Sequence, residues 1–72
     1  MIKKGFIKDY CKANNITIKD MSSATGINVN TLYFYNQLYR TPSKKNIKII
    51  SDFTNNKISI DELLLISNNR ED

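Results

Sequence analysis

The side chains in this chain that could form a binding site are amides, hydroxyls and cations, and the segment 28–45 carries all three kinds. These groups form hydrogen bonds and pair with anions. The residues that most catalytic and metal sites need are scarce, since the sequence has no His and Cys11 is its one cysteine. A zinc site needs three or four thiolate or imidazole ligands, and catalytic triads need an activating base. We therefore expect a binding protein that is not an enzyme and needs no metal or other cofactor.

The charge is divided unevenly along the sequence. Residues 1–48 carry nine Lys or Arg against two Asp, a net charge of +7, whereas residues 49–72 carry two against five, a net charge of −3. A basic body with an acidic end favours a polyanion-binding face on the first two thirds of the chain. Ordinary solvated surface charge explains the same counts, so the charge alone leaves both interpretations open.

Seventy-two residues provide one small domain, because a chain this short buries only about 60% of the surface that its unfolded form exposes. We expect that domain over residues 1–67, followed by a polar, frayed end at residues 68–72. The longest apolar run, residues 63–66, is far too short for a membrane span, and no signal-peptide core follows the first lysines. One unpaired thiol without an export signal predicts a cytoplasmic protein with no membrane contact.

Apolar residues recur at helical spacing through most of the sequence, which predicts an all-α fold of four or five short helices. The first helix carries one apolar stripe and ends at Asn14 and Asn15, because Asn tolerates the left-handed backbone that closes a helix. The second helix covers about residues 17–25. Thr17 and Asp20 form a capping box at its start, and Gly26 stops it.

The third helix is predicted over residues 29–39, after the tripeptide Gly26-Ile27-Asn28. Glycine permits the positive φ of a tight turn, and Asn28 can cap the helix that follows. Residues 31–35 are rich in β-branched and aromatic types, which by propensity alone favour a strand. The capping residue before this segment and Pro42 after it favour a helix.

Two further helices complete the predicted fold. Ser43 caps the fourth, in which Ile47, Ile50 and Phe53 share one face. After an Asn-rich loop, residues 59–62 form a capping box that opens the last helix. That helix carries four consecutive apolar residues at positions 63–66, more than one helix face can bury.

A short helix, a turn containing Gly and a second helix together make a helix-turn-helix, whose second helix can enter the major groove of DNA. The segment Thr17-Ile18-Lys19-Asp20-Met21-Ser22-Ser23-Ala24-Thr25-Gly26-Ile27-Asn28, with the spacing onward to Pro42-Ser43, resembles the Cro-like phage-repressor helix-turn-helix family, the XRE family. The resemblance covers residues 5–66. It implies a compact five-helix fold like that of the lambda repressor.

The sequence departs from that family at three places, one of which is the slightly long loop around Asn55 and Asn56. Ile18 stands where the family often has a phosphate-binding Gln, and Leu38 replaces the usual Gly near the end of the second helix of the motif. Residues 26–35 also resemble the recognition segment of MerR-type regulators. That family begins almost at its helix-turn-helix, whereas a full helix precedes the motif here, so the MerR-type interpretation is second.

The third helix supplies the residues expected to meet bases. With 100° per residue, Leu32 and Tyr35 face inward with Ile27, and the opposite face is left for reading DNA. From this geometry and the resemblance, the predicted base-contacting residues are Asn28, Val29, Asn30, Tyr33, Phe34 and Gln37. An Asn amide can pair with adenine, and apolar side chains can touch the thymine methyl group, so we expect A·T-rich sites. Core packing and a protein interface are the alternatives for the aromatic residues.

Phosphate contacts are expected from helix starts and nearby cations. The predicted phosphate-contacting residues are Thr17, Lys19, Thr31, Arg40, Thr41, Ser43, Lys44 and Lys45. For each lysine, a solvated surface position is the alternative.

The family resemblance implies a transcriptional regulator, a small Cro-type repressor of a phage or mobile element in a bacterial or phage-infected cell. It would bind a palindromic operator in double-stranded DNA as a homodimer, without a small-molecule ligand. We expect the dimer contact at Leu64, Leu65 and Ile66, because residues 63–66 give more apolar surface than one helix face can bury. The alternative is that all four residues complete the core. The alternatives are a protein-interaction module, such as an antirepressor or antitoxin, and an excisionase-like architectural factor.

Overall fold

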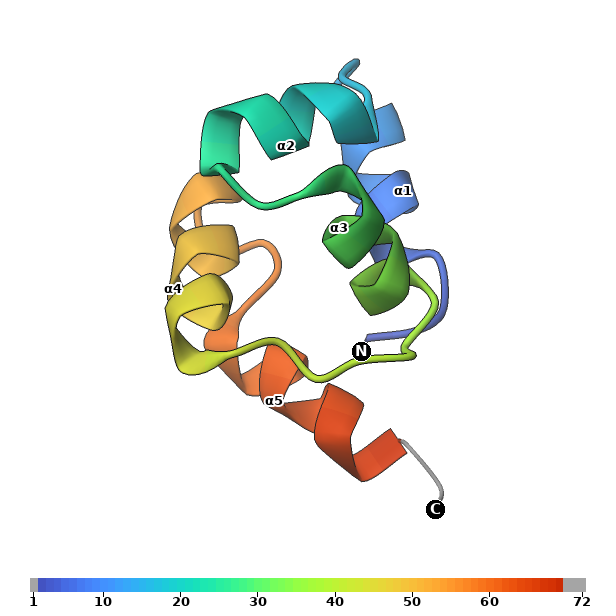
Figure 1. Cartoon of the computed structure of the whole chain (residues 1–72), viewed down its shortest axis with the longest axis vertical. Coiled ribbons are helices and arrows are strands. Elements are labelled where there is room, and N and C mark those ends of the chain that lie inside the picture. Colours follow the sequence, from blue (N-terminus) through green and yellow to red (C-terminus); the bar gives the residue numbers. More distant parts are fainter. Residues whose placement is uncertain (1, 70–72) are drawn as a thin grey trace.

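The computed structural model describes the backbone of residues 2–69 and the side chains of residues 2–66, and this part of the chain forms five helices and no strand. The helices are α1 (Phe6–Ala13), α2 (Ile18–Thr25), α3 (Val29–Asn36), α4 (Lys44–Phe53) and α5 (Ile60–Asn69) (Figure 1). The predicted all-α class and number of helices are confirmed. None of these helices is both long and apolar enough to cross a membrane.

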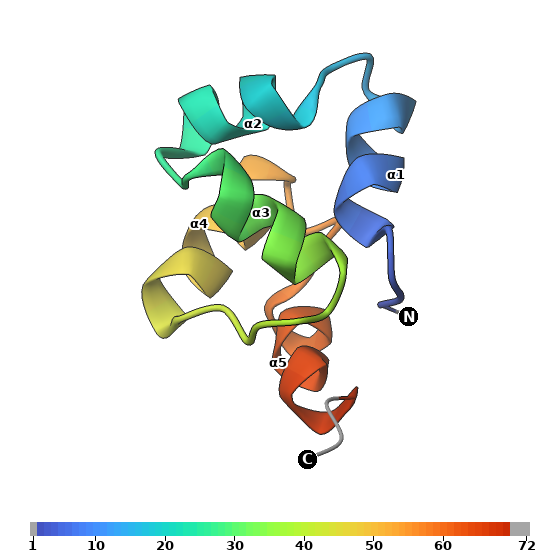
Figure 2. The same ribbon diagram turned by 45° about the vertical axis from the view of Figure 1, so that its right-hand side comes forward.

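The core lies where α3 packs against α1 and α2, while α4 packs against α2 and α5 (Figure 1; Figure 2). Each helix turns an apolar face toward it, as the helical spacing of the sequence predicted. The fully buried apolar side chains come from all five helices: Ile7, Met21, Leu32, Ile50, Leu63 and Ile66.

Side-chain caps fix the starts of several helices, as predicted. The Asp20 N–H donates to Thr17 Oγ1 and the Thr17 N–H donates to Asp20 Oδ2, both at 3.0 Å, which completes the expected capping box of α2. Ser43 Oγ accepts from the Asn46 N–H at 3.2 Å at the start of α4. The predicted capping box of Ser59 and Glu62 also forms before α5. These local bonds set where each helix enters the core.

Residues in the left-handed conformation close the helices. Asn15 has φ 59° after α1, Gly26 has φ 78° after α2, and Asn55 has φ 55° after α4. The predicted stops at Asn15 and Gly26 are therefore confirmed. Leu38 has φ 64°, a conformation that costs a residue with a Cβ about 1–2 kcal/mol.

The third helix is shorter than predicted, because it ends at Asn36 rather than at residue 39. Two bonds close it early: the Leu38 N–H donates to the Tyr35 carbonyl at 2.9 Å, and the Tyr39 N–H donates to the Phe34 carbonyl at 2.8 Å. This is the Schellman pattern, in which the left-handed residue is usually Gly. Leu38 takes that role here, at the position where the resembling family has Gly, and its half-buried side chain packs against the core.

The end of the chain also differs from the prediction. α5 continues to Asn69, so residues 68 and 69 are helical rather than a frayed tail, and residues 70–72 lie outside the described residues. Within α5, Leu63 and Ile66 are fully buried, whereas Leu64 and Leu65 are 50% and 39% exposed. Ile66 therefore belongs to the core of the single chain, and its assignment to a dimer interface was wrong.

Candidate nucleic-acid interface

Three residues between α2 and α3 fix the angle at which the two helices meet. The Gly26 N–H donates to the Ser22 carbonyl at 2.8 Å, and the Ser22 hydroxyl donates to the Ile27 carbonyl at 2.6 Å. The Ile27 side chain is buried between the helices, as predicted. Asn28 Oδ1 accepts from the Asn30 N–H at 2.8 Å and so caps α3. The turn is therefore held by side chains at both of its ends.

The two faces of α3 are chemically different. Leu32 and Tyr35 are buried as predicted, which turns the opposite side of this eight-residue helix toward solvent. Of the predicted base-contacting residues, Tyr33 is 43% exposed and Phe34 is 39% exposed. Of the other four, Asn28 and Asn30 are exposed, whereas Val29 and Gln37 are half-buried. The exposed face of α3 thus presents amides and aromatic rings rather than charges.

Phe34 is paired with a cation from the segment that follows α3. The guanidinium carbon of Arg40 lies 4.9 Å from the centre of the Phe34 ring, within the range of a cation–π contact. Both side chains are exposed. The contact brings together one predicted base-contacting residue and one predicted phosphate-contacting residue.

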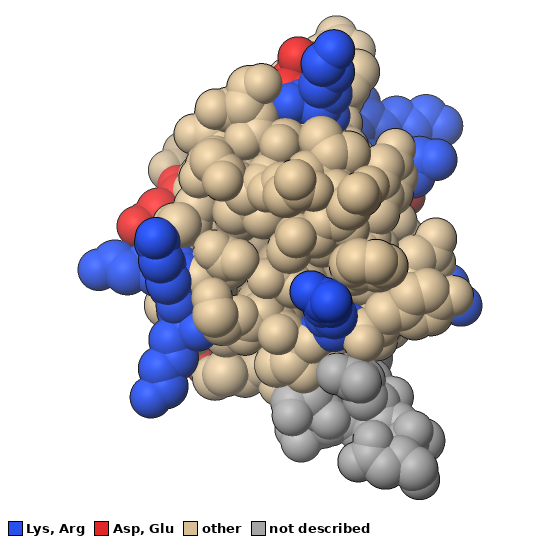
Figure 3. Space-filling model, viewed as in Figure 1, with Lys and Arg blue, Asp and Glu red and all other residues tan. Residues whose placement is uncertain are grey.

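The predicted phosphate-contacting residues flank α3 on opposite sides. Thr17 and Lys19 lie at the start of α2, and Lys44 and Lys45 lie at the start of α4, on the other side of α3 (Figure 1). Thr31 is half-buried, whereas the rest of this group is exposed: Thr17, Lys19, Arg40, Thr41, Ser43, Lys44 and Lys45. Figure 3 shows this face as a broad uncharged area with Lys and Arg on several sides and few acidic groups. Ile18, the first residue of α2, is buried in the core.

A buried amide that sequence reasoning missed positions α3. Asn36 is 2% exposed, and its Oδ1 accepts from the Ile7 and Lys8 N–H groups, each at 3.0 Å. The Asn36 carbonyl accepts from the Gly5 N–H at 2.7 Å. The residue before α1 is Gly5, which has no side chain to cap the helix, so Asn36 supplies the missing cap from 29 residues away. An amide one turn after Leu32, on the inward face, was the available signal.

A second bond ties α3 to α4. The Asn46 amide donates to the Tyr35 hydroxyl at 2.9 Å, which satisfies the polar end of an otherwise buried ring. The Asn36 side chain bonds to α1 and the Tyr35 hydroxyl bonds to α4, so hydrogen bonds hold α3 on both sides. Its exposed face is consequently fixed relative to the cations of both neighbouring helices.

The lone cysteine is a core residue. Cys11 is 3% exposed, and its sulfur lies 3.9 Å from that of Met21. Burial and, to a smaller extent, the carboxylate of Asp20 raise the pKa of the Cys11 thiol. Raising a thiol pKa lowers its thiolate fraction and so its nucleophilicity.

We predict that Cys11 reacts with a soluble disulfide reagent roughly a hundredfold or more slowly in the folded protein than in urea, because both burial and the raised pKa protect it. The absorbance of the thiolate released from the reagent measures the rate in buffer and the rate in urea, on two portions of one preparation. Equal rates in the two conditions would mean that the thiol is reachable from solvent in the folded state.

Comparison with protein-family models, with curated proteins and with solved structures gives no match to this chain. Within the described part of the chain, no three His, Cys, Asp or Glu side chains are grouped so that they could hold a metal ion. What the protein does is therefore inferred from its own residues and their geometry.

Proposed function

We propose that the protein is a sequence-specific DNA-binding transcriptional regulator, a small Cro-type repressor of a phage or mobile element with a lambda-repressor-like helix-turn-helix. The observation that carries the proposal is α3. This helix buries Leu32, Tyr35 and Asn36 and exposes amide and aromatic side chains. Arg40 lies against the exposed Phe34 ring, and α4 begins with Lys44 and Lys45. An α-helix with its side chains is about 10–12 Å across, close to the width of the major groove, about 12 Å.

The chemistry of the exposed face supports direct reading of bases. The Asn30 amide has the donor and acceptor that pair with adenine, and Val29 and Phe34 offer apolar contact to the thymine methyl group. The cations at the starts of α2 and α4, together with Arg40, supply contacts to the phosphates on either side of the groove. This division of roles predicts a preference for A·T-rich operators.

Selection from a random duplex pool, followed by gel shifts at two salt concentrations, tests the proposal. We expect enrichment of A·T-rich sequences and binding that weakens steeply as salt rises, because each phosphate contact releases counterions. Binding without sequence preference would contradict a specific regulator, and failure to bind any duplex would contradict the proposal as a whole.

The proposal includes a homodimer on a palindromic operator, since one module buries too little DNA surface for high affinity. Ile60, Leu64 and Leu65 are exposed by 45%, 50% and 39%, and they form an apolar area on α5 that a second copy could cover. Ile66 does not contribute, because it is buried.

Placing charges on this apolar area should separate the dimer. We predict that the double substitution Leu64→Asp, Leu65→Asp gives a monomer in sedimentation velocity and lowers operator affinity by roughly a hundredfold, because cooperative binding of two half-sites is lost. The control is Asn55→Asp, Asn56→Asp, which adds the same charge in an exposed loop where Asp tolerates the positive φ. A wild-type protein that stays monomeric at high concentration, with and without DNA, would contradict the dimer.

The second candidate is a protein-interaction module, such as an antirepressor or antitoxin. The same exposed residues, Ile60, Leu64 and Leu65, favour it, because an apolar area of this kind fits a different protein as well as a second copy. The gel shifts distinguish the candidates, since an interaction module without DNA binding would leave every duplex unshifted.

A further inference from the structure

A surface hollow of about 490 Å³ lies between α1, the start of α2 and α3. Thr17 and Tyr33 in its lining are among the predicted DNA contacts, whereas no residue of α1 is. Its lining is mixed, with cationic, hydroxyl and apolar side chains: Lys8, Asp9, Cys11, Lys12, Ile16, Thr17, Ile18 and Tyr33.

The polar groups of the hollow suit an anion. Lys8 and Lys12 are one helical turn apart on α1, and both are exposed. Asp9 is the one acidic side chain in the lining, so the cations outnumber it. The start of α2 adds backbone N–H groups and the positive end of the helix dipole, and the Asp20 carboxylate, which accepts from the Thr17 N–H, offsets part of this positive potential.

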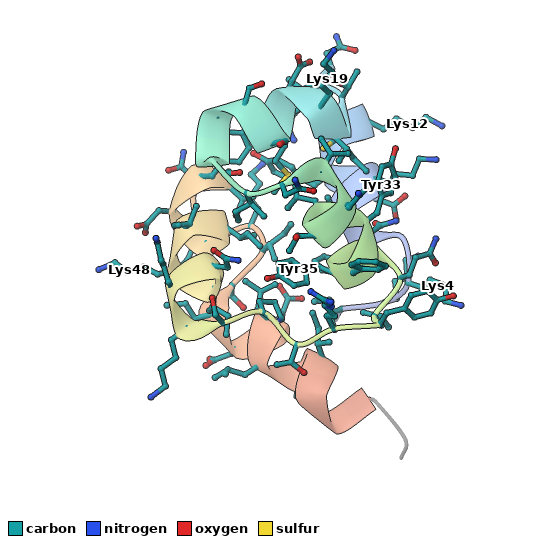
Figure 4. The ribbon with its side chains drawn as sticks, viewed as in Figure 1. Lys4, Lys12, Lys19, Tyr33, Tyr35 and Lys48 are labelled. Carbon is teal, nitrogen blue, oxygen red and sulfur yellow. The ribbon has the colours of Figure 1, made fainter. Side chains whose placement is uncertain are left out.

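The second wall of the hollow belongs to the proposed DNA-reading helix. Tyr33 of α3 is 43% exposed and lines the hollow opposite the two lysines of α1. Figure 4 shows Tyr33 on the side of α3 toward α1, with Lys12 beyond it. Phe34, in contrast, pairs with Arg40. The two adjacent aromatic residues therefore have different neighbours and different chemistry.

We propose that this hollow binds a phosphate of the DNA backbone at the edge of the major groove that α3 enters, with Lys8 and Lys12 as the cationic ligands and the Tyr33 hydroxyl as a further donor. The inference rests on the proposed function and extends the interface to α1. It also assigns Tyr33 to the phosphate backbone rather than to a base edge. Charged and hydroxyl donors are the groups that make most phosphate contacts.

A matched pair of double variants tests the site on the full-length protein. Lys8→Ala, Lys12→Ala removes the proposed ligands, and Lys3→Ala, Lys57→Ala removes the same charge from a different hollow. For the first variant we expect roughly tenfold weaker binding to operator and nonoperator DNA alike. The slope of log K against log salt should become shallower by about 0.9. The second variant should keep the wild-type slope.

Equal slopes for the two double variants would show that only net charge matters and would overturn the inference while leaving the proposed function intact. No DNA binding by the wild-type protein would overturn both. Circular dichroism checks that each variant is folded. If the alanine variant is not, Lys8→Gln, Lys12→Gln, which keeps a polar, unbranched side chain and a similar helix propensity, repeats the test.

Tyr33→Phe isolates the hydroxyl, because it keeps the ring. We expect affinity to fall by about three- to tenfold on all sequences, with the selected operator unchanged. A changed base preference in this variant would place Tyr33 at a base edge and overturn its assignment to the phosphate. Inorganic phosphate, titrated into ¹⁵N-labelled protein at constant ionic strength, should leave the Lys8, Lys12 and Tyr33 signals unchanged. A saturable shift there would indicate a site for a free anion and overturn the assignment to DNA.

Discussion

Replacing Asn36 by Ala is expected to lower the free energy of unfolding by about 2–3 kcal/mol. The side chain is 2% exposed, and its Oδ1 accepts from the N–H groups of Ile7 and Lys8 at the start of α1. Alanine leaves these donors without their acceptor in a site that water cannot readily enter. Urea denaturation measures the change, which corresponds to a fall in melting temperature of roughly 10–20 °C for a domain of this size.

Asn36→Asp is the matched control for this prediction. A carboxylate keeps an acceptor oxygen at the place of Asn36 Oδ1 and puts a negative charge at the N-terminus of α1, where the helix dipole favours it. We expect Asn36→Asp to recover most of the stability at neutral pH. If Asn36→Ala unfolds within about 0.5 kcal/mol of the wild type, the two hydrogen bonds do not hold α3 against α1.

Replacing Arg40 by Ala is expected to weaken binding to every duplex by roughly ten- to a hundredfold, because the residue supplies a charge-assisted phosphate contact. Its guanidinium lies 4.9 Å from the Phe34 ring centre, which holds it at the edge of the reading face. The salt dependence of log K should become shallower by about 0.9. Fluorescence anisotropy on a selected operator and on a scrambled duplex measures both quantities.

Two further variants separate charge, stacking and base reading. Arg40→Lys keeps the charge but loses the planar group that stacks on Phe34, so it should retain the salt slope and lose only part of the affinity. Asn30→Ala removes an exposed amide from the reading face and should reduce the preference for operator over scrambled DNA without changing the slope. If Arg40→Ala, like Asn30→Ala, weakens binding to the operator but not to scrambled DNA, Arg40 reads a base and the division of roles is incorrect.

Much of the fold could be predicted because its helix boundaries are encoded locally. Thr17 and Asp20 lie three residues apart, and their two hydrogen bonds form within one turn, so the sequence pattern suffices to place the start of α2. Gly26 likewise supplies a positive φ that most other residues avoid. The spacing of 100° per residue was enough to predict which residues of α3 face inward, and the burial of Leu32 and Tyr35 confirms that prediction.

The errors came from features that depend on distant or unusual contacts. The early end of α3 rests on Leu38 in a left-handed conformation, which propensity assigns to Gly or Asn rather than to Leu. The cap that Asn36 gives to α1 joins residues 29 positions apart, so the inward-facing amide on α3 indicated a buried polar group but not its partner. In α5, the run of four apolar residues did not show which two face the core, because that depends on how α5 packs against α4.

The most direct test of the central claim, that the exposed face of α3 binds DNA, is a titration of ¹⁵N-labelled protein with a selected operator duplex, followed by NMR. We predict that the largest shift changes fall on α3, the start of α2 and the segment from Arg40 to Lys45, with those on α1 limited to Lys8 and Lys12. Outside a dimer contact, the rest of the chain should change little. Shifts confined to α5 and the adjoining side of α4, with α3 unchanged, would contradict the claim.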